Sequence, residues 1–74
     1  MSKSRDRFIA LAESRTKRAI KDLRLIGNLS NKSNYSYDTE DVAKIFRTLD
    51  NELKSAKKRF VDSSRLSASI DFKL

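Results

Sequence analysis

The chain has 74 residues with 17 Lys and Arg against 10 Asp and Glu, which gives a formal net charge of +7. A chain of this length forms one small domain at most, near the size at which a single core barely suffices. Cysteine and histidine are absent from the sequence, which excludes disulfides, thiolate metal sites and the commonest general base. The basic excess predicts a polyanionic partner, with nucleic acid first.

The sequence predicts no membrane partner. It has no run of about eighteen apolar residues, the length a spanning helix needs. The basic N-terminal segment lacks an apolar signal-peptide core, because Glu13 and Arg15 interrupt it. An amphipathic membrane-surface helix is disfavoured because tryptophan is absent. We therefore expect a cytoplasmic protein.

Apolar and small residues recur in steps of three and four along the first third of the chain. The positions of this first seam are Ile9, Ala12, Thr16, Ala19, Leu23 and Ile26. The spacing predicts an amphipathic helix over about residues 4–27 with heptad-like packing. Gly27 follows the last seam residue, so we expect it to end the helix as a left-handed C-terminal cap.

A second seam follows with the same spacing. Its members are Val42, Phe46, Leu49, Leu53, Ala56 and Phe60. It predicts a second helix over about residues 38–61. Asp38 is the expected N-cap, and Tyr37 and Val42 have the spacing of a hydrophobic staple. Glu40 and Asp41 place negative charge at the positive end of the helix dipole.

The two seams together predict an all-α fold. An antiparallel hairpin about a connector at 28–37 would pair residues whose numbers sum to roughly 68, which places the small Ala19 and Thr16 opposite Leu49 and Leu53. One such hairpin covers only one side of each helix, so we expect a homodimeric four-helix bundle. The predicted domain organisation is a helical hairpin over 1–61 and a C-terminal tail over 62–74.

The connector differs in composition from both helices. It contains both tyrosines, Tyr35 and Tyr37, and three asparagines, Asn28, Asn31 and Asn34. Asn and Ser side chains bond local backbone in turns, so this segment is interpreted first as a bend. The alternative is a functional tip that bonds to or stacks on bases or a partner surface.

The tail changes period. Leu66, Ala68, Ile70, Phe72 and Leu74 alternate with polar residues, which predicts a strand. Because an isolated strand is unstable, the alternatives are a flexible tail, pairing with a second copy, or addition to the sheet edge of a partner.

The basic residues suggest a nucleic-acid-binding surface. Residues 1–28 hold eight Lys and Arg against three acids, so the acids that would balance an ordinary solvated face are missing. The candidate binding residues are Arg5, Arg7, Phe8, Arg15, Lys17, Arg18, Lys21 and Arg24, joined by Lys57 and Lys58 near the end of the second helix. The cations would contact phosphates. Phe8 is the candidate for specificity through stacking, and a peripheral core position is its alternative.

Two short segments resemble the Rop-type plasmid regulators. "RFI" at residues 7–9 is similar to a tripeptide of their first helix, and "KRF" at 58–60 is similar to the end of their second. The resemblance implies a helical hairpin that dimerises and binds paired RNA hairpins, with Phe8 as an RNA contact. The chain departs from that family in its longer connector, its more basic first helix and its tail. Residues 24–60 also resemble stretches of small bacterial proteins, but this resemblance gives no indication of a function.

The sequence predicts no enzyme and no cofactor or metal. Asp38, Glu40 and Asp41 are explained by helix capping, and no serine has a histidine to activate it. We predict a small basic protein that binds structured RNA, ahead of duplex DNA, through its first helix. The alternative is an adaptor or inhibitor from a phage, plasmid or defence system. It would bind a larger protein through its connector and tail, with Tyr35, Tyr37, Ile70, Phe72 and Leu74.

Overall fold

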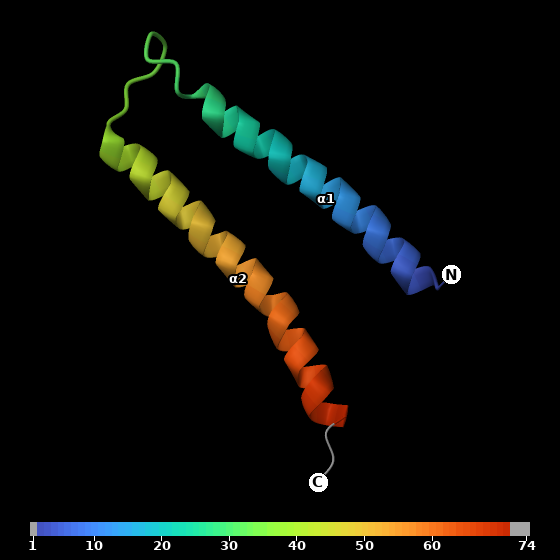
Figure 1. Ribbon diagram of the computed structural model, residues 1–74. Helices are drawn as coiled ribbons and strands as arrows, with labels where there is room; N and C mark the ends of the chain where they lie inside the picture. Colours follow the sequence, from blue (N-terminus) through green and yellow to red (C-terminus); the bar gives the residue numbers. More distant parts are fainter. Residues whose placement is uncertain (1, 72–74) are drawn as a thin grey trace. The chain divides into compact units, whose positions relative to one another are not determined.

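The chain is all-α, as predicted. The computed structural model describes residues 2–71, and for residues 64–71 it describes the backbone alone. Helix α1 spans Lys3–Asn28 and helix α2 spans Thr39–Asp71 (Figure 1). No strand occurs in the described part of the chain. The chain divides into two units, Met1–Ser36 with α1 and Tyr37–Leu74 with α2.

Helix α1 begins one residue before the predicted start because Ser2 caps it. The Ser2 side-chain oxygen accepts a hydrogen bond from the Arg5 amide at 3.1 Å. The Asp6 amide donates to the Ser2 carbonyl at 3.1 Å. Ser2 thereby satisfies an amide that would otherwise lack a partner at the helix start.

The prediction for Gly27 is wrong. Gly27 lies inside α1, and its φ is not positive. The helix ends at Asn28, and its C-cap, Leu29, keeps right-handed angles of φ −70° and ψ −7°. The Leu29 amide donates to the Ile26 carbonyl at 3.0 Å, and the Ser30 amide donates to the Gly27 carbonyl at 3.1 Å. These tighter 3₁₀-type bonds satisfy the Ile26 and Gly27 carbonyls without a left-handed residue.

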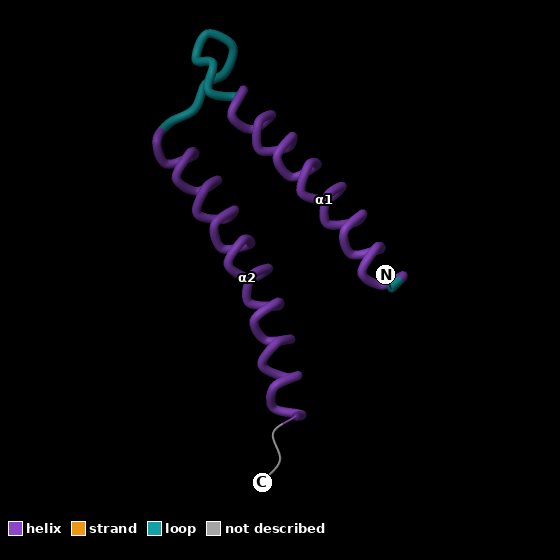
Figure 2. The backbone as a smooth tube through the Cα atoms, turned by 45° about the vertical axis from the view of Figure 1, so that its right-hand side comes forward, coloured by secondary structure: helices purple, strands orange, loops and turns teal. Residues whose placement is uncertain are grey.

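The connector spans residues 29–38 and is the loop between the two helices in Figure 2. Its hydrogen bonds centre on Asn31. The Asn31 side-chain oxygen accepts from the Ser33 amide at 3.1 Å and from the Ser33 hydroxyl. The Asn31 carbonyl accepts from the amides of Asn34 and Tyr35 at 3.1 and 3.0 Å. The predicted local bonding of Asn and Ser side chains is therefore confirmed at Asn31.

Helix α2 begins with a reciprocal cap that confirms Asp38 as the N-cap. The Asp41 amide donates to the Asp38 carboxylate at 2.8 Å, and the Asp38 amide donates to the Asp41 carboxylate at 3.1 Å. This is the capping-box pattern with aspartate in place of the usual Glu or Gln. Tyr37, at the position before the cap, is half-buried.

Helix α2 continues ten residues beyond its predicted end. The alternation at 66–74 predicted a strand, and this prediction is wrong for 66–71, because α2 runs without interruption to Asp71. No proline or glycine follows Phe60, and adding residues to an existing helix is easier than starting a new element. Residues 72–74 lie outside the described part of the chain.

Large apolar side chains are exposed along both helices. No residue among 2–63 is buried. In the second seam, Leu53 and Phe60 are 56% and 65% exposed. Neither helix is long and apolar enough, over the described residues, to cross a membrane. Both helices therefore present apolar faces that nothing in the described part of the chain buries.

Candidate nucleic-acid interface

A row of basic residues runs along α1 on the side opposite the first seam. Its positions recur in steps of four and three, which keeps them on one face of a helix with about 100° per residue. The cations of this α1 basic row are Lys3, Arg7, Lys17, Lys21 and Arg24, all of them exposed. Ala10, Ser14 and Asn28 complete the row, so no acid lies within it. At 1.5 Å per residue its cations, from Lys3 to Arg24, span about 32 Å.

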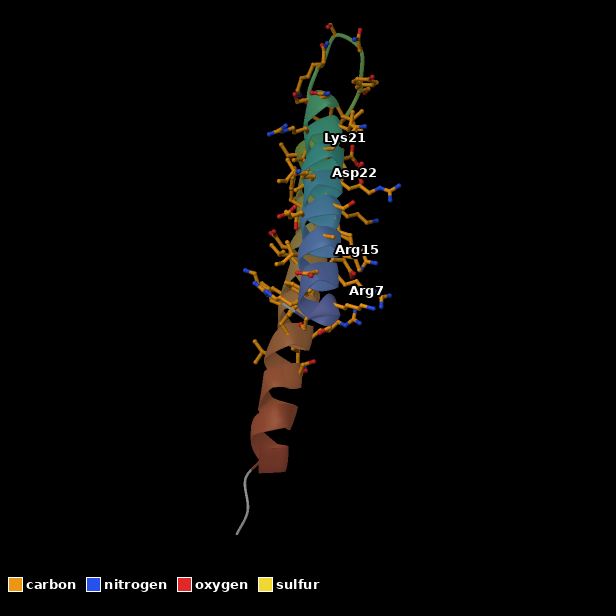
Figure 3. The ribbon with its side chains drawn as sticks, turned by 90° about the vertical axis from the view of Figure 1, so that its right-hand side faces the viewer. Arg7, Arg15, Lys21 and Asp22 are labelled. Carbon is orange, nitrogen blue, oxygen red and sulfur yellow. The ribbon has the colours of Figure 1, made fainter. Side chains whose placement is uncertain are left out.

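A second column of α1 lies between the basic row and the first seam. It contains Phe8, Leu11, Arg15, Arg18 and Asp22, which also recur in steps of three and four. Figure 3 shows Arg7, Arg15 and Lys21 distributed along the length of α1, with Asp22 next to Lys21 in the sequence. This α1 edge column brings the predicted aromatic residue onto the same side as two predicted phosphate-binding arginines.

Arg5 differs from the other predicted cations. It continues the first seam by one step of four and therefore lies on the apolar side of α1. Its guanidinium carbon is 5.7 Å from the centroid of the Phe8 ring, within the range of a cation–π interaction. Phe8 remains 49% exposed. Arg5 and Phe8 thus form an accessible cation–π pair near the start of α1.

Lys57 and Lys58 belong to α2, in the other unit of the chain. They are adjacent in sequence and hence about 100° apart around the helix. Lys57 lies beside the second seam, whereas Lys58 lies on the far side. The sequence prediction omitted Lys3 of the α1 basic row, and also Lys44, Arg47 and Lys54, which share the face of Lys58. The signal that identifies all four is their spacing opposite a seam.

The residues of the alternative, protein-binding hypothesis differ in exposure and in position. Tyr35 is 48% exposed in the connector, whereas Tyr37 is half-buried. Ile70 lies in the helical part of the predicted tail, and Phe72 and Leu74 lie outside the described residues. No group of three acidic side chains able to hold a metal ion occurs within the described part of the chain.

Searches for related proteins find no relative. No protein-family model, no curated protein and no solved structure matches this chain.

Proposed function

We propose that this protein binds structured RNA, without enzymatic activity, through the outer side of α1. The observation that carries the proposal is the α1 basic row, five exposed cations without an acid among them. Such a row attracts a polyanion and contacts phosphates with little choice of sequence. The Arg5–Phe8 pair adds a surface on which an unpaired base can stack, as sequence-selective RNA binding requires.

We infer that the binding species is a homodimer built from two antiparallel hairpins. The support is that no residue of either apolar seam is buried, although a stable fold covers such a face. The ends of the seams also match, because both become polar at positions whose numbers sum to 68. Arg5 continues the first seam and Ser63 continues the second. Since the α1 basic row lies opposite the seam, covering the seam leaves the row accessible.

In this mechanism the dimer stabilises or masks a folded RNA. Two symmetry-related copies of α1 contact the backbone of paired segments through the basic rows. Arg15 and Arg18 of the edge column extend the contact, and Phe8 stacks on a base that is not paired. A homodimeric bundle has no separate recognition helix set for a DNA major groove, which favours RNA over duplex DNA.

The test is fluorescence anisotropy with a labelled RNA hairpin, a single-stranded RNA and a duplex DNA, each at low and near-physiological salt. The variant Lys17→Ala/Lys21→Ala removes two cations from the α1 basic row. The expected result is hairpin binding that persists near physiological salt and a salt slope reduced by about 2 in the variant, roughly 1 per phosphate contact.

A charge-matched control separates the row from net charge. Lys32→Ala/Arg59→Ala also removes two cations, but neither belongs to α1. It should bind the RNA hairpin with a salt slope close to that of the unchanged protein. Equal weakening of both double variants, or equal binding of all three nucleic acids that disappears at the higher salt, would reduce the α1 basic row to a generic attraction.

A second candidate function is supported by Tyr35. This exposed aromatic follows a turn fixed by four hydrogen bonds to Asn31, and an ordered loop with an accessible tyrosine suits a protein partner. The addition of residues 62–71 to a partner's sheet is no longer part of this candidate, because these residues are helical. The adaptor hypothesis predicts that Tyr35→Ala abolishes binding to the protein partner and leaves RNA binding unchanged.

A further inference from the structure

Helix α2 carries a basic row of its own on the side opposite the second seam. Its members recur in steps of three, four, three and four, the spacing of a straight line along one face. The row consists of Lys44, Arg47, Asn51, Lys54 and Lys58, all of them exposed. Because the second seam lies on the other side, these side chains stay accessible when the seam is covered.

Acidic residues of α2 offset this α2 basic row in the net charge of the helix. Between Lys44 and Lys58 the acids are Asp50 and Glu52. At about 100° per residue, neither falls within the row, and they lie on opposite flanks of the second seam. The outer face from Lys44 to Lys58 is therefore basic although the helix as a whole is close to neutral.

The shape and chemistry of the row fit a base-paired stem. Its ends are fourteen residues apart in a continuous helix, or about 21 Å. Duplex DNA carries about one charge per 1.7 Å of axis, so a row of this length faces several phosphates of a comparable RNA stem. The row contains no aromatic residue, whereas proteins that bind single strands combine a basic groove with aromatic stacking platforms.

We propose that the α2 basic row binds the phosphate backbone of an RNA stem, while the Arg5–Phe8 pair of α1 takes an unpaired base. This inference rests on the proposed function and gives it a substrate class, a stem with unpaired loop bases. Lys44, Arg47, Lys54 and Lys58 contact phosphates. Asn51 donates to a phosphate or a ribose hydroxyl. The aromatic residues of α2, Phe46 and Phe60, lie in the second seam and take no part.

The test uses three RNAs: a hairpin, the same stem as a blunt duplex, and the loop sequence as a single strand. Lys54→Ala/Lys58→Ala matches Lys17→Ala/Lys21→Ala, because each removes two lysines four residues apart on an outer helix face. The expected result is a salt slope on the blunt duplex reduced by about 2 in the α2 variant. Phe8→Leu should weaken binding to the hairpin and leave the blunt duplex unchanged.

The outcomes separate this inference from the proposed function. If the unchanged protein binds no RNA near physiological salt, the proposed function itself is wrong. If it binds and the α1 variant loses affinity, but the α2 variant keeps the salt slope of Lys32→Ala/Arg59→Ala on the duplex, the α2 basic row is not an RNA surface. If the protein bound poly-glutamate more tightly than the blunt duplex at equal salt, the α2 basic row would instead be a site for an acidic protein.

Discussion

Gly27 occupies an ordinary helical position, although glycine is the residue least suited to a helix apart from proline. A Cβ built on it meets no atom within 4 Å, and its φ is compatible with any residue. Gly27→Ala should therefore stabilise α1 by about 0.5–1 kcal/mol, because alanine loses less backbone freedom on folding. The measurement is urea unfolding at fixed protein concentration, followed by circular dichroism at 222 nm.

The matching control for Gly27→Ala reverses the substitution elsewhere in α1. Ala10 is exposed and lies within the helix, so Ala10→Gly should destabilise the protein by a similar amount. A lower stability in Gly27→Ala would show that Gly27 adopts the left-handed cap after all, since alanine is strained in that conformation.

Asp38 acts through its carboxylate oxygen rather than through burial. Its side chain is exposed, and the bond from the Asp41 amide is 2.8 Å long. Asp38→Ala should destabilise α2 by about 1 kcal/mol, whereas Asp38→Asn keeps an acceptor at the same place and should cost much less. The comparison is made by urea unfolding. Equal losses in the two variants would assign the effect to charge at the helix dipole instead of to the cap.

At the scale of the element, the seams predicted most of both helices. The first seam placed α1 within a residue at each end, and Asp38 marked the start of α2 because its cap is local chemistry. The end of α2 was missed for a physical reason. Leu66 and Ile70 are four residues apart, and with Ala68 between them they fit a strand period and a helix period equally well.

The candidate site was predictable in α1 and only partly so in α2. The cations of α1 stand out because few acids accompany them. Those of α2 do not, because Asp50 and Glu52 balance them in the sequence and are separated from Lys54 and Lys58 only once the residues are placed around a helix. The position of Arg5 on the apolar side likewise depends on that placement.

The helical continuation of α2 yields a prediction about residues 62–71. Their Cα chemical shifts should have the sign typical of a helix. Ser64→Pro should remove that signal from residues that follow it, because proline eliminates a backbone donor and clashes with the preceding turn. Nuclear magnetic resonance of the labelled protein measures both. Ser64→Ala is the control and should keep or strengthen the helical shifts; extended shifts in the unchanged protein would restore the strand hypothesis.

At the scale of the whole molecule, the central fact is that no side chain among residues 2–63 is buried while two regular apolar seams exist. Folding stability depends mainly on burying such surface. The seams and the basic rows also lie on opposite sides of their helices. The proposed dimer therefore uses the seams and the proposed phosphate contacts use the opposite faces, while the Arg5–Phe8 pair lies at the polar end of the first seam.

Two leucines with nearly equal exposure test this separation. Leu53 belongs to the second seam and is 56% exposed, whereas Leu25 lies outside the first seam and is 54% exposed. Leu53→Ser should weaken the proposed homodimer by roughly 3 kcal/mol, about a hundredfold in dissociation constant, because two copies of the side chain leave the proposed interface. Leu25→Ser should leave the dimer intact.

Sedimentation equilibrium measures the mass of each variant. The midpoint of thermal unfolding should rise with protein concentration in the unchanged protein and in Leu25→Ser. If Leu53→Ser remained as dimeric as Leu25→Ser, the seams would not form the interface between copies; a monomeric unchanged protein would mean that a different chain covers them.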